Sequence, residues 1–98
     1  MHTQGLPAPN LQVVHRDRDG IIGRVDFDFD GYVTVVEFDG ILKYADASAD
    51  ELVREKIRED RLRGIGLEVV RTTWPDLDRP AHTAARIRAA FARARRTA

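Results

Sequence analysis

The chain has 98 residues, of which 43% are hydrophobic, and its 16 basic and 16 acidic side chains give a formal net charge of zero. This length supplies the core of one small domain, residues 1–98, and excludes a second domain. The absence of cysteine excludes disulfide frameworks and thiolate chemistry.

Residues 1–38 predict an antiparallel meander preceded by a loop. Pro7 and Pro9 cannot continue a helix, so residues 1–10 are expected to form a lead-in loop. Two segments, Asp17-Arg18-Asp19-Gly20 and Asp30-Gly31, have the composition of tight hairpin turns. They separate three stretches with strand character, residues 11–15, 21–29 and 32–38.

Residues 48–66 predict an amphipathic helix. Ser48 is the expected N-cap, because Glu51 follows three residues later as in a capping box. Gly64 and Gly66 end the helix. The expected apolar stripe consists of Leu52, Ile57 and Leu62, with Val53 and Ile65 at its edges, and the charged residues lie on the other side.

The remaining residues predict a strand and a basic helix. β-branched residues favour a strand at 67–74, and residues 79–98 predict a basic C-terminal helix with Pro80 in its first turn. The helix at 48–66 is long enough to serve as a crossover between strands. We therefore predict an α/β fold, a small mixed sheet with elements in the order β-β-β-α-β-α. The apolar face of the last helix is expected to consist of Ala84, Ile87, Phe91 and Ala94.

Charge is distributed unevenly along the chain. Acids outnumber bases between Asp26 and Glu51, whereas every charged residue from Arg79 onward is basic. This asymmetry suits a nucleic-acid binder whose acidic patch holds a metal ion, but an arginine-rich helix is also typical of a solvated face. No run of about 18 apolar residues occurs, and the chain does not begin like a signal peptide. We therefore expect a cytoplasmic protein with no membrane partner.

The stretch 25–40, VDFDFDGYVTVVEFDG, places five acidic side chains in the second hairpin. A two-residue turn would place Asp26 opposite Val35 and, in the same register, Glu37 opposite Arg24. Asp26 and Glu37 would then be diagonal neighbours on one face, about 7 to 8 Å apart at Cα and within reach of one divalent cation. Alternation assigns the opposite face to the core, with Val25, Phe27, Phe29, Thr34, Val36 and Phe38.

Two interpretations of this acidic face are open. On a solvated face, a Glu37–Arg24 ion pair would need no metal ion. A face covered by a helix, as Val33 and Val35 on it indicate, would require a counter-charge for the carboxylates. A Mg²⁺ or Mn²⁺ ion could supply that charge, and so could one of the cations Lys43, Lys56 and Arg71.

The other acids of this stretch and the three histidines give weaker indications of a functional site. Asp28 and Asp30 are expected to serve the turn, where Asp favours tight geometry. Asp39 is either a further metal ligand or a turn residue before Gly40. A zinc site is not expected, because no ligand spacing relates His2, His15 and His82.

Several short motifs follow one another between Gly5 and Leu77. They are Gly5-Leu6-Pro7, Gly23-Arg24-Val25-Asp26-Phe27, Glu37-Phe38-Asp39-Gly40 with Lys43-Tyr44, Glu59-Asp60 with Leu62, and Gly66 with Val70-Arg71, Trp74 and Asp76-Leu77. In this order and spacing they resemble the PD-(D/E)xK nuclease superfamily, and within it the very-short-patch-repair-like endonuclease domains common in actinobacteria.

The resemblance implies a restriction-endonuclease-like core that cuts a DNA phosphodiester bond with Mg²⁺ or Mn²⁺. By position, Asp26 and Glu37 would be catalytic metal ligands. Asp39 stands where the superfamily has its lysine, so Lys43 would take over that catalytic role near the scissile phosphate. The residues expected to contact the nucleic acid are Lys56, Arg58 and Arg71.

The family core usually begins with a helix that bears another acid, and this chain has no such helix ahead of Gly5. Without it one side of the sheet would be exposed, so we expect a homodimer or a partner chain that covers this side. The alternative to an enzyme is a catalytically inactive nuclease-fold module that binds DNA or protein in a phage, defence or toxin–antitoxin context.

Overall fold

A computed structural model describes residues 5–38 and 48–97, except for the side chains at positions 74, 96 and 97. A 3-10 turn, η2 (Asp30–Tyr32), joins the second strand to the third. The elements in chain order are the strands β1 (Asn10–Asp17), β2 (Gly20–Phe29) and β3 (Thr34–Phe38), the helix α2 (Ala49–Gly64), the strand β4 (Glu68–Thr72), and the helices α3 (Trp74–Leu77) and α4 (Pro80–Thr97).

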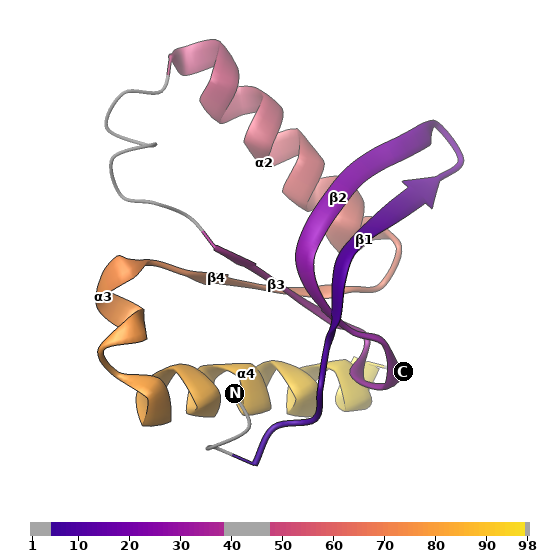
Figure 1. Cartoon of the computed structure of the whole chain (residues 1–98). Coiled ribbons are helices and arrows are strands. Elements are labelled where there is room, and N and C mark those ends of the chain that lie inside the picture. Colours follow the sequence, from indigo (N-terminus) through magenta and orange to yellow (C-terminus); the bar gives the residue numbers. More distant parts are fainter. Residues whose placement is uncertain (1–4, 39–47, 98) are drawn as a thin grey trace.

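The four strands form one mixed sheet in the order β1-β2-β3-β4. The first three strands are antiparallel neighbours, and β4 runs parallel to β3 after the crossover through α2. Helix α2 lies on one side of β3 and β4, and α4 lies on the other (Figure 1). The predicted α/β class and mixed sheet are confirmed. In the described part of the chain, no helix combines the length and apolar character required to span a membrane.

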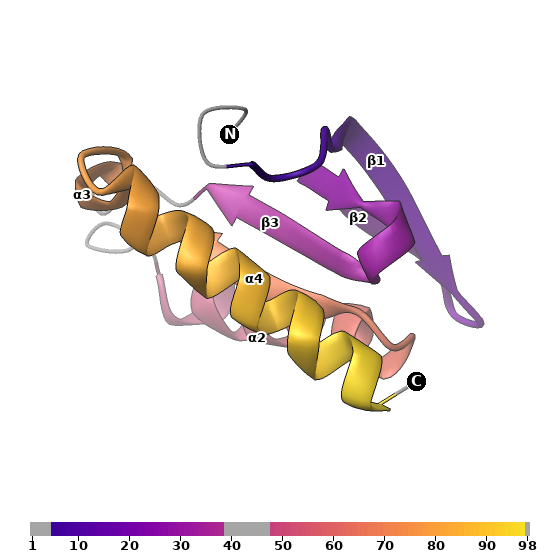
Figure 2. The ribbon, with the colours of Figure 1, turned by 90° about the horizontal axis from the view of Figure 1, so that it is seen from below.

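Each face of the sheet carries its own core. Helix α4 runs across one side of the sheet (Figure 2). On this side, the buried apolar residues come from the lead-in loop, the sheet and the helix face that the sequence predicts. On the α2 side, the cluster draws mainly on the strands. The first cluster contains Leu6, Phe29, Val36, Val70, Ala84, Ile87, Ala90 and Phe91, and the second contains Ile22, Val25, Val35, Leu62 and Val69.

The predicted register of the β2–β3 hairpin is wrong by two residues. Asp28, and not Asp26, lies opposite Val35. The connection is longer than Asp30-Gly31, because η2 is closed by a 3.3 Å hydrogen bond from the Val33 amide to the Asp30 carbonyl. Val33 adopts a left-handed conformation with φ of 52°, which a β-branched residue rarely does, so turn composition gave no sign of it.

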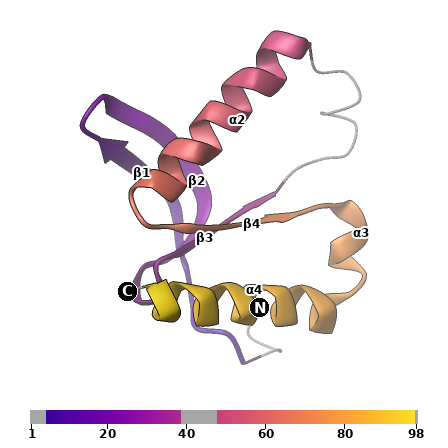
Figure 3. The same cartoon turned by 180° about the vertical axis from the view of Figure 1, so that it is seen from behind.

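The β1–β2 hairpin twists out of the plane of the sheet toward α2 (Figure 3). Gln12 has φ of 55°, and a bulge shifts the register between His15 and Arg16. Such irregularities add to the right-handed twist of paired strands. As a result, Val25 packs in the α2 cluster while Phe27 packs against the α4 cluster, although alternation had placed both side chains on one face.

Helix α2 does not bury the apolar stripe that the sequence predicts. Ser48 caps it as expected, with its Oγ accepting from the Glu51 amide at 3.2 Å. Within α2, which the structure describes in full, Leu62 alone is buried. Leu52, Val53 and Ile57 are 43%, 57% and 54% exposed. The face of α2 toward the sheet carries charged side chains, because the strands supply residues of opposite charge that pair with them.

Protonation of Asp17 is expected to release the hairpin tip from α2. Arg61 donates to both carboxylate oxygens, from Nε at 2.8 Å and from Nη2 at 2.6 Å, and this bonding lowers the pKa of Asp17 from 3.8 to about 2. Because the folded-state pKa lies below the unfolded one, Asp17 stabilises the fold above about pH 4, and this contribution is lost as the pH falls toward about 2.

Urea unfolding of the wild type and of Asp17→Asn between about pH 2 and pH 6 measures this contribution. The difference in unfolding free energy between the two proteins should be constant above about pH 4 and should shrink below it. A difference that does not change with pH would contradict the expectation.

Candidate functional site

Asp26 and Glu37, the two carboxylates predicted to hold a metal ion, are brought together at the end of the β2–β3 ladder. The ladder ends with the pair Phe27–Val36, so that Asp26 directly precedes the last paired residue of β2 and Glu37 directly follows that of β3. Asp26 Oδ2 accepts a 2.8 Å hydrogen bond from the Phe38 amide, and Oδ1 accepts a 3.4 Å hydrogen bond from Gln12 Nε2. The Asp26 carboxylate is therefore held beside Phe38, the residue that follows Glu37 on β3.

The predicted Glu37–Arg24 ion pair is wrong, and Arg58 of α2 takes its place. Glu37 is 7% exposed, and its Oε1 accepts a 2.6 Å hydrogen bond from Arg58 Nη1. Arg58 Nη2 donates to the Arg24 backbone carbonyl at 2.6 Å. The hydrogen bond with Glu37 raises the pKa of Arg58. The guanidinium also passes over Gly23, where an added Cβ would lie 2.8 Å from Nε.

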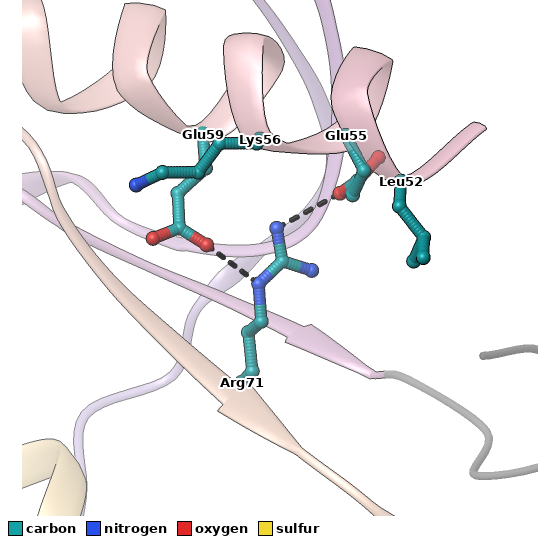
Figure 4. A pocket seen from close by; sticks show the side chains of 5 residues that line it. All are labelled: Leu52, Glu55, Lys56, Glu59 and Arg71. Carbon is teal, nitrogen blue, oxygen red and sulfur yellow. Dashed lines mark hydrogen bonds and ion pairs between the residues drawn. The ribbon is translucent and has the colours of Figure 1, made fainter. Parts of the chain in front are cut away.

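Glu37 and Arg58 are the first members of an alternating chain of charges between α2 and the sheet. Glu55 accepts from Arg58 at 3.2 Å and from Arg71 of β4 at 2.8 Å. Glu59 accepts a hydrogen bond from Arg71 Nε at 2.7 Å, one of the two contacts of Arg71 marked in Figure 4. Burial raises the pKa of Glu59, but the hydrogen bonds from Arg71 and Arg63 outweigh it, and the pKa is lowered. This network holds a helix that has little apolar contact of its own.

A pocket of about 180 Å³ opens beside this network. Lys56 lies at its rim and pairs with Asp60 at 3.0 Å, with 71% and 57% of the two side chains exposed. Arg58 and Arg71, which we expect to contact nucleic acid, are engaged with carboxylates of the protein itself. The residues that line the pocket are Leu52, Glu55, Lys56, Glu59 and Arg71 (Figure 4).

Two predicted site residues, Asp39 and Lys43, lie outside the described residues. Among the residues that the structure describes, no group of three or more His, Cys, Asp or Glu side chains could hold a metal ion. Asp26 and Glu37 therefore form at most a two-carboxylate site within this part of the chain.

An interaction between His15 and Asp28 is not among the sequence predictions. His15 Nε2 lies 2.8 Å from Asp28 Oδ2, and Asp28 is 5% exposed. Asp28 is therefore a buried partner of β1 and not the turn residue that we predicted. Both residues occur in predicted strands that are neighbours, but strand alternation could not reveal the contact because the hairpin is twisted.

No protein-family model matches this chain, and neither a curated protein nor a solved structure does so. The likeness to the PD-(D/E)xK nucleases consequently stays a prediction from the motifs.

Proposed function

We propose that this protein is a nuclease-like domain that acts on DNA through a divalent metal ion held by Asp26 and Glu37. The observation that carries the proposal is the 2.8 Å hydrogen bond from the Phe38 amide to Asp26. It places Asp26 of β2 beside Phe38, the residue that follows Glu37 on β3. Arg58 lies at the same end of the strands, because it donates to Glu37. Neighbouring acids on adjacent strands are what a shared cation requires.

The acceptor atoms of this pair support a cation site. Glu37 uses Oε1 for Arg58, and Oε2 has no hydrogen-bond partner among residues 5–38 and 48–97. Asp26 uses Oδ2 for the Phe38 amide, whereas Oδ1 has only the 3.4 Å contact with Gln12. Each carboxylate therefore retains one oxygen with acceptor capacity, and hard oxygen ligands suit Mg²⁺ or Mn²⁺. Asp39 is the proposed third ligand.

The chain's own residues would do the following work. Asp26 and Glu37 hold the ion, which when bound would polarise a phosphoryl oxygen and lower the pKa of its water. Arg58 keeps its positive charge across the physiological pH range, since its pKa is raised, and would offset negative charge at the phosphate. Lys43 is proposed to act near the scissile phosphate.

A second candidate function is the catalytically inactive module that binds DNA or protein. The 2.6 Å Arg58–Glu37 pair favours it, because this pair already gives a buried carboxylate the counter-charge that it needs. In that case Glu37 would contribute to stability and not to chemistry.

Glu37→Gln, with Glu55→Gln as a matched control from the same network, distinguishes the two functions. Isothermal titration of Mn²⁺ and plasmid nicking in the same buffers are the measurements. If Glu37 is a ligand, Glu37→Gln should lower Mn²⁺ affinity at least about 10- to 100-fold and abolish nicking, while Glu55→Gln keeps both. Equal behaviour of the two variants, or no Mn²⁺ binding by the wild type, would contradict the nuclease proposal and favour the module.

A further inference from the structure

The outward surface of the β1–β2 hairpin carries a set of exposed basic and apolar side chains, which we call the ribbon face. Val14 and Ile21 are 43% and 57% exposed on it. The hairpin extends past the rest of the sheet alongside the end of α2 (Figures 1 and 3). The ribbon face consists of Val14, Arg16, Arg18, Ile21 and Arg24, all of them exposed.

Strand pairing places these side chains together. Val14 lies opposite Arg24, and Arg16 lies opposite Ile21. Arg18 belongs to the two-residue turn between β1 and β2. Directly opposite residues on a strand pair share a face, so the arginines and the apolar side chains alternate across it. The side chains between them on β1, Val13, His15 and Asp17, are half-buried and turn toward the protein.

The ribbon face carries an excess of positive charge. Asp17 and Asp19 are the only acids from residue 10 to residue 24, and Asp17 is engaged with Arg61. Within the part of the chain that the structure describes, Arg16, Arg18 and Arg24 form no ion pair. On α4, by contrast, Arg86 and Arg93 are paired with Asp76 and Glu68. The hairpin is therefore the better candidate for an anionic partner.

The hairpin is also held in place before any partner arrives. Arg61 binds both oxygens of Asp17 and also donates to the backbone carbonyls of Gly20 and Ile21, at 3.3 Å and 3.4 Å. Ile22 and Val25 anchor the inner face in the core on the α2 side. A surface that is already ordered loses less conformational entropy on binding.

We propose that the ribbon face docks on double-stranded DNA, with Arg16, Arg18 and Arg24 at phosphates. A two-stranded β-ribbon fits the major groove of B-DNA, and exposed apolar side chains can meet thymine methyl groups there. This inference rests on the proposed function, since it supplies the substrate surface. Arg24 and Asp26 lie two residues apart on β2, about 7 Å along the strand, so the docked duplex would reach the candidate site.

Fluorescence anisotropy with a labelled duplex of about 20 base pairs, at about 50 to 200 mM salt, tests the proposal. The test variant is Arg16→Gln/Arg18→Gln/Arg24→Gln. The control, which removes the same charge from exposed residues elsewhere, is Arg54→Gln/Arg79→Gln/Arg95→Gln. The test variant should bind about 10- to 100-fold more weakly. The slope of its log affinity against log salt concentration should fall by the equivalent of about two to three phosphate contacts. The control should stay within about threefold of the wild type, and melting curves should show all three proteins folded.

Several results would overturn the proposal: equal weakening of both variants, a larger loss in the control, no salt-dependent binding by the wild type, or tighter binding of the matching RNA duplex. Nicking by the same proteins separates this proposal from the nuclease. If the duplex binds through the ribbon face but Glu37→Gln and the wild type nick it equally, the nuclease proposal fails and the ribbon stands. If nicking depends on Glu37 and the ribbon variant binds and nicks normally, the ribbon alone fails.

Discussion

Phe29→Ala is expected to lower the free energy of unfolding by about 3 to 5 kcal/mol, which is the range for removing a buried aromatic ring. Phe29 is 2% exposed, and its ring lies edge to face with Phe91 of α4, with centroids 5.2 Å apart. Phe91 in turn stacks on Tyr32 of η2 at 4.3 Å. The cavity would therefore weaken both the contact between sheet and helix and the turn that sets the β2–β3 register.

Urea denaturation followed by circular dichroism measures this loss. Domains of this kind are stable by roughly 5 to 15 kcal/mol in total, so the loss is a large share of the total stability and should clearly lower the urea midpoint of Phe29→Ala. Leu77→Ala is the control, because Leu77 is 57% exposed and surface truncations usually change stability by no more than about 0.5 kcal/mol. Equal losses in the two variants would contradict the described core.

Arg58→Met is expected to destabilise the protein by about 2 to 4 kcal/mol. It keeps the length of the side chain but leaves the carboxylate of Glu37, whose side chain is 10% exposed, without its cation. Removing one partner of a buried ion pair costs more than the pair contributes, because the remaining charge stays desolvated. The expected loss lies toward the lower end of such cases, since 19% of the Arg58 side chain is exposed and water screens part of the interaction.

A double-mutant cycle identifies Glu37 as the cause. Adding Glu37→Gln to Arg58→Met should recover at least about 1 kcal/mol, since no charge is then left unpaired. Lys56→Met serves as the control: its exposed pair with Asp60 should contribute at most about 0.5 kcal/mol. If the two changes at Glu37 and Arg58 were simply additive, the ion pair would not be what holds this part of α2.

These two substitutions act on different kinds of attachment. Helix α4 packs on the sheet through a continuous apolar face that includes Ile87 and Phe91, so its stability depends on area removed from water. Helix α2 buries only Leu62 within its own length and is held mainly by arginine–carboxylate contacts. The attachment of α2, which borders the candidate site, is therefore sensitive to substitutions that change charge. The attachment of α4, on the opposite side of the sheet, is sensitive to substitutions that change side-chain volume.

Local rules explain which predictions were confirmed. Ser48 caps α2, Asp17 to Gly20 form a hairpin turn, and Ala84, Ile87, Phe91 and Ala94 are buried. Capping and turn formation depend on residues within a few positions of one another. A helix with a clear apolar stripe buries that stripe against the core.

The failed predictions depended on an unusual turn conformation or on a distant residue. Alternation could not foresee that Val33 would take a left-handed conformation and shift the β2–β3 register. A count of apolar residues on α2 could not foresee that Glu55, Arg58 and Glu59 would face the sheet, because their partners Glu37 and Arg71 come from strands far along the chain. The pair of Asp28 and His15 was missed for the same reason, because the two residues come from different strands.

The sequence by itself determined the α/β class, the mixed sheet, the ends of α2 and the inner face of α4, because periodicity and short-range hydrogen bonding decide those features. Only the tertiary structure decided which charges meet. Asp26 meets the Phe38 amide, Glu37 meets Arg58, and the arginines of the ribbon face are left pointing outward. Long polar side chains have many possible partners in sequence, and the packing of α2 on a twisted hairpin is what selects among them.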